Sequence, residues 1–212
     1  NEVTSGVRWY DCAGLNFPRT GYWHAVAVWA LDAAEDYDCR LHAESAGAED
    51  GYAANIGSSY RAAGWLDAVL VNRRLLGQDD YDVGVVNRYG GVGQYRGIKV
   101  VSQGCTFGDS STIILSANQY LRMLEFNVTS DDTGYVSMTA KVDPALGPVR
   151  IAWFDPAFTT GGLDDAEQEQ VTDAGGWARI DVHIGDPGYQ CLALFRNPVD
   201  GSDSVPVIIE FE

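Results

Sequence analysis

Apolar and polar residues alternate with a period of two in three stretches of the chain, 37–42, 136–142 and 177–184. Successive side chains of a β-strand point to opposite faces of its sheet, so each stretch predicts a strand with one buried and one solvated face. In the first stretch the positions expected on the solvated face are Asp38, Arg40 and His42. Further strands are expected at 23–31, 66–72, 81–87, 96–102, 111–117, 120–128, 149–154, 189–195 and 205–211.

Glycine-rich turn clusters separate these stretches, and no amphipathic helix of normal length is evident. Residues 163–170 are expected to form one or two helical turns at most. A faint repeat, Ala63-Gly64-Trp65 and Gly175-Gly176-Trp177, opens a strand in each half. The pattern therefore predicts an all-β chain of two tandem antiparallel β-sandwich domains, residues 1–110 and 111–212.

The second half resembles bacterial immunoglobulin-like domains of the invasin and intimin type. The matching residues run from Val136 to Val142 and from Gly147 to Phe154, followed by Val171–Ile180. That last stretch carries Thr172, Asp173, Gly176 (or Gly175) and Ala178 in a T-D-x-x-G-x-A turn. Asp can bond its own backbone and Gly can supply a positive φ. The resemblance implies an Ig-like or jelly-roll-like sandwich without a catalytic site.

The first half is similar to the bacterial pre-peptidase C-terminal domain, a small β-sandwich of secreted proteins. Its matching elements are Asp36–Leu41, then Gly64-Trp65, then Asp80–Val85. Both resemblances imply an exported protein of a cell surface or an extracellular assembly. Because the chain opens with Asn1 rather than Met, we expect the mature product of a cleaved precursor, or a fragment.

Acidic residues outnumber basic ones by 30 to 14, which gives a net charge of −16. This charge disfavours binding to nucleic acid and to an anionic membrane surface. No apolar stretch approaches the roughly 20 residues that span a bilayer. Cations remain plausible partners, and Ca²⁺ in particular is a possible cofactor. An alternative explanation of the charge is solubility or a salty habitat.

Paired carboxylates form the candidate Ca²⁺ site. Asp36 and Asp38 flank Tyr37, and Asp80 and Asp82 flank Tyr81. If the two segments start neighbouring strands, these four carboxylates converge at one end of a sandwich and supply oxygen ligands. The alternative is a solvated acidic loop.

Four cysteines, Cys12, Cys39, Cys105 and Cys191, lack the CxxC spacing of zinc or thioredoxin sites. Two disulfides, or one disulfide and two buried thiols, fit an exported protein. Of the three possible pairings, our hypothesis is Cys12–Cys39 with Cys105–Cys191, one bond closing each half.

No pattern indicates catalysis. His24, His42 and His183 lack metal-binding spacing and are expected as ordinary sheet or surface residues. Gly108-Asp109-Ser110-Ser111 is expected to be a turn, because no Gly-x-Ser-x-Gly motif accompanies it. The glycine-rich segment 90–97 is followed by a strand rather than a helix, so we expect a hairpin and not a nucleotide site. We therefore expect a protein that is not an enzyme.

Exposed aromatic residues and strand edges are the candidate interaction sites. Trp177 falls on the solvated side of its strand, and Tyr95 lies in the expected hairpin. The terminal strand is apolar at Val205, Val207 and Ile209 and can pair within its domain or with a neighbour. The sequence therefore predicts an extracellular structural or adhesive module, a subunit of a surface or filamentous assembly that self-associates or binds other surface proteins. The alternative is a carbohydrate-, matrix- or calcium-binding accessory module of a secreted enzyme.

Overall fold

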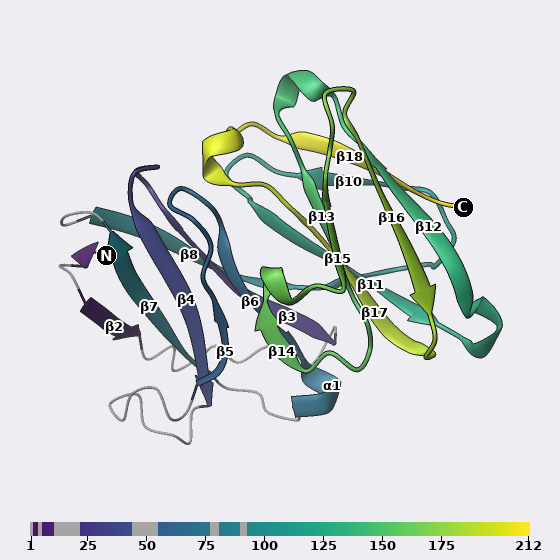
Figure 1. Cartoon of the computed structure of the whole chain (residues 1–212), viewed down its shortest axis with the longest axis horizontal. Coiled ribbons are helices and arrows are strands. Elements are labelled where there is room, and N and C mark those ends of the chain that lie inside the picture. The colour runs from purple at the N-terminus through teal and green to yellow at the C-terminus, as the bar shows by residue number, and fades with distance from the viewer. Residues whose placement is uncertain (1, 4–5, 11–21, 44–54, 77–80, 90–92) are drawn as a thin grey trace. The chain divides into compact units, whose positions relative to one another are not determined.

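The computed structural model describes residues 2–3, 6–10, 22–43, 55–76, 81–89 and 93–212. These residues form β-strands with one short helix, α1 (Arg73–Leu76), so the expected all-β class is confirmed. They divide into two compact units (Figure 1): unit 1 comprises 1–101 with 159–165, and unit 2 comprises 102–158 with 166–212. Within the described residues, no helix is both long enough and apolar enough to cross a membrane.

Unit 1 is built from two antiparallel sheets. The first has the order β1 (Glu2–Val3), β8 (Gly93–Val101), β3 (Trp23–Ala30), β6 (Asp67–Asn72) and β14 (Thr160–Gly162). The second has the order β2 (Gly6–Tyr10), β7 (Tyr81–Tyr89), β4 (Asp36–Ala43) and β5 (Asn55–Ser59). Buried side chains of both sheets form one core, to which β3 contributes Val26 and Val28 and β4 contributes Cys39 and Leu41.

Unit 2 repeats the two-sheet plan with different strand orders. One sheet runs β10 (Ser111–Leu115), β18 (Val205–Phe211), β12 (Gly134–Lys141) and β16 (Trp177–Ile184). The other runs β15 (Gln168–Val171), β13 (Arg150–Phe154), β17 (Gly188–Phe195), β11 (Leu121–Val128) and β9 (Gln103–Cys105). The β9–β11 pair is parallel. Short 3₁₀ turns of unit 2 lie at Ser130–Asp132, Pro144–Leu146 and Pro198–Asp200, and a further one at Leu163–Asp165 belongs to unit 1.

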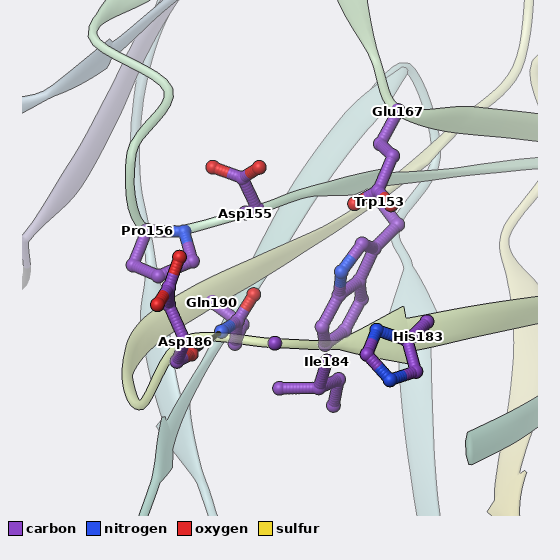
Figure 2. Close-up of a pocket in the computed structure, with 9 residues that line it drawn as sticks. Trp153, Asp155, Pro156, Glu167, His183, Ile184, Asp186 and Gln190 are labelled. Atoms are coloured by element: carbon purple, nitrogen blue, oxygen red, sulfur yellow. Dashed lines mark hydrogen bonds between the residues drawn. The ribbon is translucent and has the colours of Figure 1, made fainter. Parts of the chain in front are cut away.

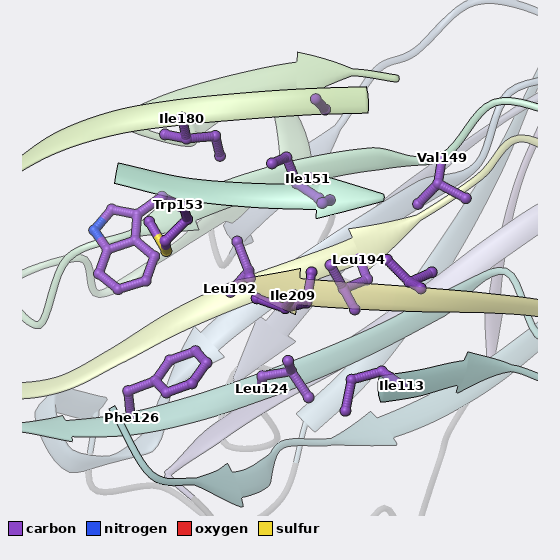
Figure 3. Close-up of a cluster of buried hydrophobic side chains, with 14 of the residues drawn as sticks. Ile113, Leu124, Phe126, Val149, Ile151, Trp153, Ile180, Leu192, Leu194 and Ile209 are labelled. Atoms are coloured by element: carbon purple, nitrogen blue, oxygen red, sulfur yellow. The ribbon is translucent and has the colours of Figure 1, made fainter. Parts of the chain in front are cut away.

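The core of unit 2 lies between these sheets (Figure 3). Phe126 of β11 and Trp153 of β13 stack with ring centroids 6.2 Å apart. Strand β16 alternates strictly between exposed and buried positions, so Ile180 faces this core while Arg179 faces solvent. Burial of each large apolar side chain contributes about 1.5–3 kcal/mol, so the alternation specifies which face of the strand is inside.

The expected turn before β16 is confirmed in atomic detail. Asp173 Oδ1 accepts hydrogen bonds from the backbone N–H groups of Gly175 (2.8 Å) and Trp177 (3.0 Å). Gly176 has a φ of 83°, and a Cβ there would lie 2.2 Å from the carbonyl oxygen of Val142. Only glycine meets both conditions, because other residues are strained at positive φ and need space for Cβ.

The two units differ in extent from the two predicted domains, 1–110 and 111–212. Strand β9 belongs to unit 2, and the segment 159–165 belongs to unit 1 although unit 2 surrounds it in sequence. Its strand β14 pairs with β6, with Gly161 opposite Leu70. Arg61 binds Asp164 at 3.0 Å and adds an ion pair to this attachment. A three-residue strand is too short to show a period-two alternation, so the sequence does not predict which strand it pairs with.

The polar side of β4 is buried, contrary to the expectation of a solvated face. Asp38, Arg40 and His42 are each almost fully covered. The Arg40 guanidinium lies over the Tyr60 ring at 5.7 Å, and Asp38 pairs with Arg88. Buried charges of this kind persist in proteins when they are paired or hydrogen-bonded.

Candidate functional site

The paired strands β4 and β7 separate the backbone of Asp82 from Asp36 and Asp38. Asp36 and Asp38 begin β4, and the antiparallel register places Asp82 opposite His42, toward the other end of β4. The two Asp-Tyr-Asp segments do start neighbouring strands, but antiparallel strands start at opposite ends of a sheet. Asp80 lies outside the described residues and only the backbone of Asp82 is described, so the four-carboxylate site as a whole stays a prediction.

Asp36 and Asp38 instead form part of a partly compensated charge cluster in unit 1. Burial raises the pKa of Asp36, the neighbouring Asp38 raises it further, and Arg88 opposes both effects. Burial also raises the pKa of Asp38, while its hydrogen bond to Arg88 lowers it. The carboxylates thus already have a cationic partner in Arg88. Within the described part of the chain, no three His, Cys, Asp or Glu side chains are grouped to hold a metal ion.

The predicted Cys105–Cys191 bond is not formed, and both residues are thiols. Cys105 on β9 and Cys191 on β17 are separated by β11, a spacing of roughly 10 Å for two inter-strand steps. Cys105 also packs on the core, whereas Leu192 and Leu194 face that core and Cys191 faces the opposite side of the sheet. A disulfide requires Cα atoms within about 7 Å.

The other predicted bond, Cys12–Cys39, involves one residue outside the described ranges, because Cys12 is not described. Cys39 is buried on β4, and its Sγ lies 3.8 Å from the backbone oxygen of Val26. This pairing stays a prediction.

Four of the five predicted interface residues lie in the cores. Tyr95 on β8 is 9% exposed, and its ring centroid lies 5.4 Å from that of Tyr37. The expected hairpin is not formed, because β7 and β8 belong to different sheets. Val205, Val207 and Ile209 are buried on β18. Strand β18 is flanked by β10 and β12, so its hydrogen-bonding edges are occupied within unit 2.

Trp177 is the predicted interface residue that the structure leaves exposed. It begins β16, is 42% exposed, and carries Lys141 of β12 over its ring at 4.6 Å. At the other end of the same strand pair, Tyr135 is 86% exposed and contacts the His183 ring at 4.7 Å. Lys141 pairs with Trp177 and Tyr135 with His183 in the register, so the two aromatic groups lie six residues apart on one face.

We call this surface the outer face of unit 2. Its residues are the outward-pointing ones of two strands, Tyr135, Ser137, Thr139 and Lys141 of β12 and Trp177, Arg179, Asp181 and His183 of β16.

A polar network occupies the middle of the outer face. Arg179 binds Asp181 at 2.9 Å and Glu212 at 3.4 Å, and it donates to the Ser137 hydroxyl at 2.6 Å. The Ser137 hydroxyl also donates to Asp181, and with Arg179 it lowers the pKa of that carboxyl. Exposed pairs of this kind contribute little to stability, so a partner can exchange them at low cost.

Sequence reasoning identified Trp177 but missed Tyr135. The signal is present in the sequence: Ser137, Thr139 and Lys141 are the polar positions of the alternating stretch 136–142, and Tyr135 has the same parity. Extending that strand by one residue toward its start would have placed a second aromatic residue on the same face.

No family model and no curated protein matches the chain. Solved structures similar to parts of it include the pre-peptidase C-terminal domain of the Bacillus anthracis collagenase, at 9% identity and a TM-score of 0.41 over 53% of this chain and 96% of that one. Aeromonas hydrophila PliG, a periplasmic inhibitor of g-type lysozyme, matches at 14% identity and a TM-score of 0.33 over 53% of this chain and 100% of that one.

A structure of Bacillus endospore appendages, described as disulfide-linked pili, matches at 18% identity and a TM-score of 0.33 over 49% of this chain and 82% of that one. The collagenase domain is of the kind that the first half resembles, while the resemblance of the second half to invasin-type domains is not confirmed. At these identities and TM-scores the likenesses carry no argument about what the chain binds or does.

Proposed function

We propose that the chain is a non-catalytic extracellular module that acts through the outer face of unit 2, as a subunit of a surface or filamentous assembly. The observation that carries the proposal is the pair of exposed aromatic residues, Tyr135 and Trp177, at the two ends of one sheet face. Tyr and Trp supply large contact areas and are enriched where proteins meet partners.

The dimensions of this face suit an extended contact. Six residues at roughly 3.4 Å each separate the two aromatic groups by about 20 Å. The network around Arg179 lies between them and offers hydrogen-bonding groups on a solvated surface. Strand β16 ends its sheet, and Gln168 of β15 donates a hydrogen bond to its Asp181 backbone oxygen, so a partner is expected to meet the face of β16 rather than its edge.

Charge sets the conditions under which copies associate. A net charge of −16 makes identical chains repel one another. Screening by salt weakens this repulsion over distances beyond about 8–10 Å. Self-association through the outer face is therefore expected to strengthen as the salt concentration rises, opposite to contacts held by complementary charges.

Sedimentation velocity over a range of protein and NaCl concentrations tests the proposal. We expect concentration-dependent association of the unchanged chain in high salt, and its loss in Tyr135→Ala and Trp177→Ala. Val199→Ala removes an exposed side chain elsewhere in unit 2 and serves as the matched control. A strict monomer under every condition, or equal loss in the control, contradicts the proposed assembly.

A second candidate function is favoured by the same aromatic pair: an accessory module that binds carbohydrate. Aromatic rings stack on sugar rings, and Ser137, Arg179 and Asp181 supply donors and acceptors between them. Binding on a glycan array that Trp177→Ala abolishes would favour this function over self-association. A melting temperature that rises with CaCl₂ and falls with EDTA would instead support the predicted Ca²⁺ binding.

A further inference from the structure

A cavity of about 200 Å³ opens at one end of unit 2, beside His183 and Ile184 (Figure 2). It lies where β13 ends at Phe154 and where β16 ends at Ile184 before β17 begins. Its inner wall consists of side chains that are almost fully buried, Trp153, Ile184 and Gln190. Exposed or half-buried residues around them form the mouth.

Gln190 places an unsatisfied acceptor in this inner wall. The side chain is 1% exposed, and its Nε2 donates to the backbone oxygen of Asp186 at 3.0 Å. That bond fixes the amide orientation, because a carbonyl oxygen accepts only from the NH₂ group. The amide oxygen therefore turns away from Asp186 into the cavity (Figure 2), and no described residue donates a hydrogen bond to it. A buried acceptor in this state is unfavourable until a donor binds.

The mouth of the cavity is acidic. Asp155, Glu167 and Asp186 contribute three carboxyl groups, and His183 contributes an imidazole. Burial raises the pKa of Glu167, the charge of Asp155 raises it further, and His183 opposes them. The carboxylates are thus close enough to repel each other, and a bound cation would relieve this repulsion.

Size and lining restrict the kind of cation. The volume is below the roughly 300–1,000 Å³ of sites for drug-sized ligands, so it suits a group as small as one side chain. The lining is mostly polar, and half-buried Pro156 adds apolar surface at the mouth that a short alkyl stem can cover. The described chain also groups no three side chains of the metal-binding types closely enough for an ion.

We propose that this cavity binds a primary ammonium group on an alkyl stem, the chemistry of a lysine side chain. The ammonium has three donors and no acceptor. One donor bonds to Gln190 Oε1 at the inner wall, and the stem leaves through the mouth beside Pro156, where Asp155 and Glu167 supply the negative charge. This site shares His183 with the outer face, but its recognition of an ammonium group does not depend on the Arg179-centred contacts or on self-association.

Titrations of the full chain, followed by ¹⁵N-resolved NMR, test the proposal. The probe is Nα-acetyl-lysine methylamide, and the matched neutral probe is Nα-acetyl-norleucine methylamide, which keeps the stem and lacks the ammonium. The reporters are the Gln190 side-chain amide and the Trp153 indole N–H. We expect saturable shifts of both reporters with the lysine probe alone. Butylammonium chloride carries the stem and the ammonium without the peptide groups, so we expect it to shift the same two reporters.

Two variants of the acidic mouth are compared with one matched control. Asp155→Asn keeps the acceptor for the backbone N–H of Ala157 (2.7 Å), and Glu167→Gln keeps the side-chain length. Asp143→Asn removes a charge from an equivalent turn, where Asp143 Oδ1 accepts from Ala145 N at 2.9 Å, beside the opposite end of β12. Each cavity variant should weaken the lysine probe about two- to fivefold, and Asp143→Asn should not change its affinity.

Several outcomes overturn the proposal. Equal shifts with the norleucine probe would show that the ammonium is not recognised. No shift with the lysine probe or butylammonium at tens of millimolar would show that neither amine binds. Saturable shifts of the same two reporters with CaCl₂, displaced by EDTA and unaccompanied by binding of the lysine probe, would assign the cavity to a metal ion. If Asp143→Asn weakened the affinity for the lysine probe equally, the effect would come from net charge and not from the cavity.

Discussion

Asp67 offers a direct test of the electrostatics of unit 1. The side chain is 1% exposed at the start of β6, and its Oδ1 accepts a hydrogen bond from the backbone N–H of Arg61 at 2.9 Å. The pKa of Asp67 is raised from the ordinary value of 3.8 to about 7, chiefly by burial; the bonds to Arg61 and Ser59 oppose this shift, and the charges of Asp38 and Asp36 add to it. The substitution Asp67→Asn removes the charge and keeps the acceptor.

The expected magnitude follows from linkage between protonation and folding. A carboxyl whose pKa is higher in the folded state stabilises the fold fully below its unfolded pKa, and this contribution is lost as the pH rises through the folded value. For Asp67 the window runs from about pH 4 to about pH 7. The two pKa values differ by roughly 3, which corresponds to about 4 kcal/mol as an upper bound. Asp67→Asn should therefore be the more stable protein at pH 8 and similar to the unchanged chain near pH 4.

Hydrogen exchange of the β6 amides, measured by mass spectrometry at pH 5 and pH 8 after correction for intrinsic rates, reports the stability of unit 1. The difference between variant and unchanged chain is the useful quantity, because Asp36, Asp38 and His42 are common to both. Burial and Arg40 lower the pKa of His42, so its own contribution is lost on acidification, opposite in direction to that of Asp67. Asp131→Asn, an exposed position in unit 2, is the control.

The reasoning is refuted if the variant and the unchanged chain lose protection in parallel between pH 5 and pH 8. It is also refuted if Asp67→Asn is the less stable protein at pH 8, since the buried charge would then be stabilising. A pH-dependent gain in Asp131→Asn as large as that in Asp67→Asn would point to net charge rather than to the buried site.

Three further predictions concern unit 2 and are checked by urea unfolding or by mass spectrometry. Ile180→Ala should lower the free energy of unfolding by about 2–5 kcal/mol, because the side chain is fully buried. Arg179→Ala, on the exposed side of β16, should change it by no more than about 0.5 kcal/mol, and equal losses in the two variants would contradict the alternation. Gly176→Ala should destabilise more than Gly108→Ala, because both glycines have positive φ but only the first would place a Cβ 2.2 Å from a carbonyl oxygen. Burial and Glu125 raise the pKa of the Cys191 thiol, so iodoacetamide should modify it only after unfolding; rapid modification of the native chain would place it at the surface.

Much of the fold was predictable because the decisive signals are local. The alternation in β16 and the turn at Asp173 each depend on residues within one stretch, and both agree with the structure. The buried polar side of β4 could not be recognised in the same way. Its cover comes partly from Tyr60 and Arg88, whose proximity depends on how distant segments fold.

The candidate site was only partly predictable for a related reason. Trp177 followed from parity along one strand, whereas the burial of Val205 depends on β10 and β12, which come from earlier parts of the chain. The separation of Asp82 from Asp36 depends on the antiparallel pairing of β4 with β7. Strand direction and neighbour order are properties of the whole sheet, and alternation along one segment does not encode them.

The placement of β14 affects how this protein is made. Since residues 159–165 complete a sheet of unit 1, the chain passes between the units three times, at 101–102, 158–159 and 165–166. A ribosome delivers the first five strands of unit 2 in chain order, β9 to β13, before it delivers the last strand of unit 1. During synthesis, the edge of β6 that later pairs with β14 therefore stays unpaired until residues 160–162 have been made. Genetic truncation after residue 110 would preserve this unfinished state permanently, so expression of the N-terminal half alone invites aggregation.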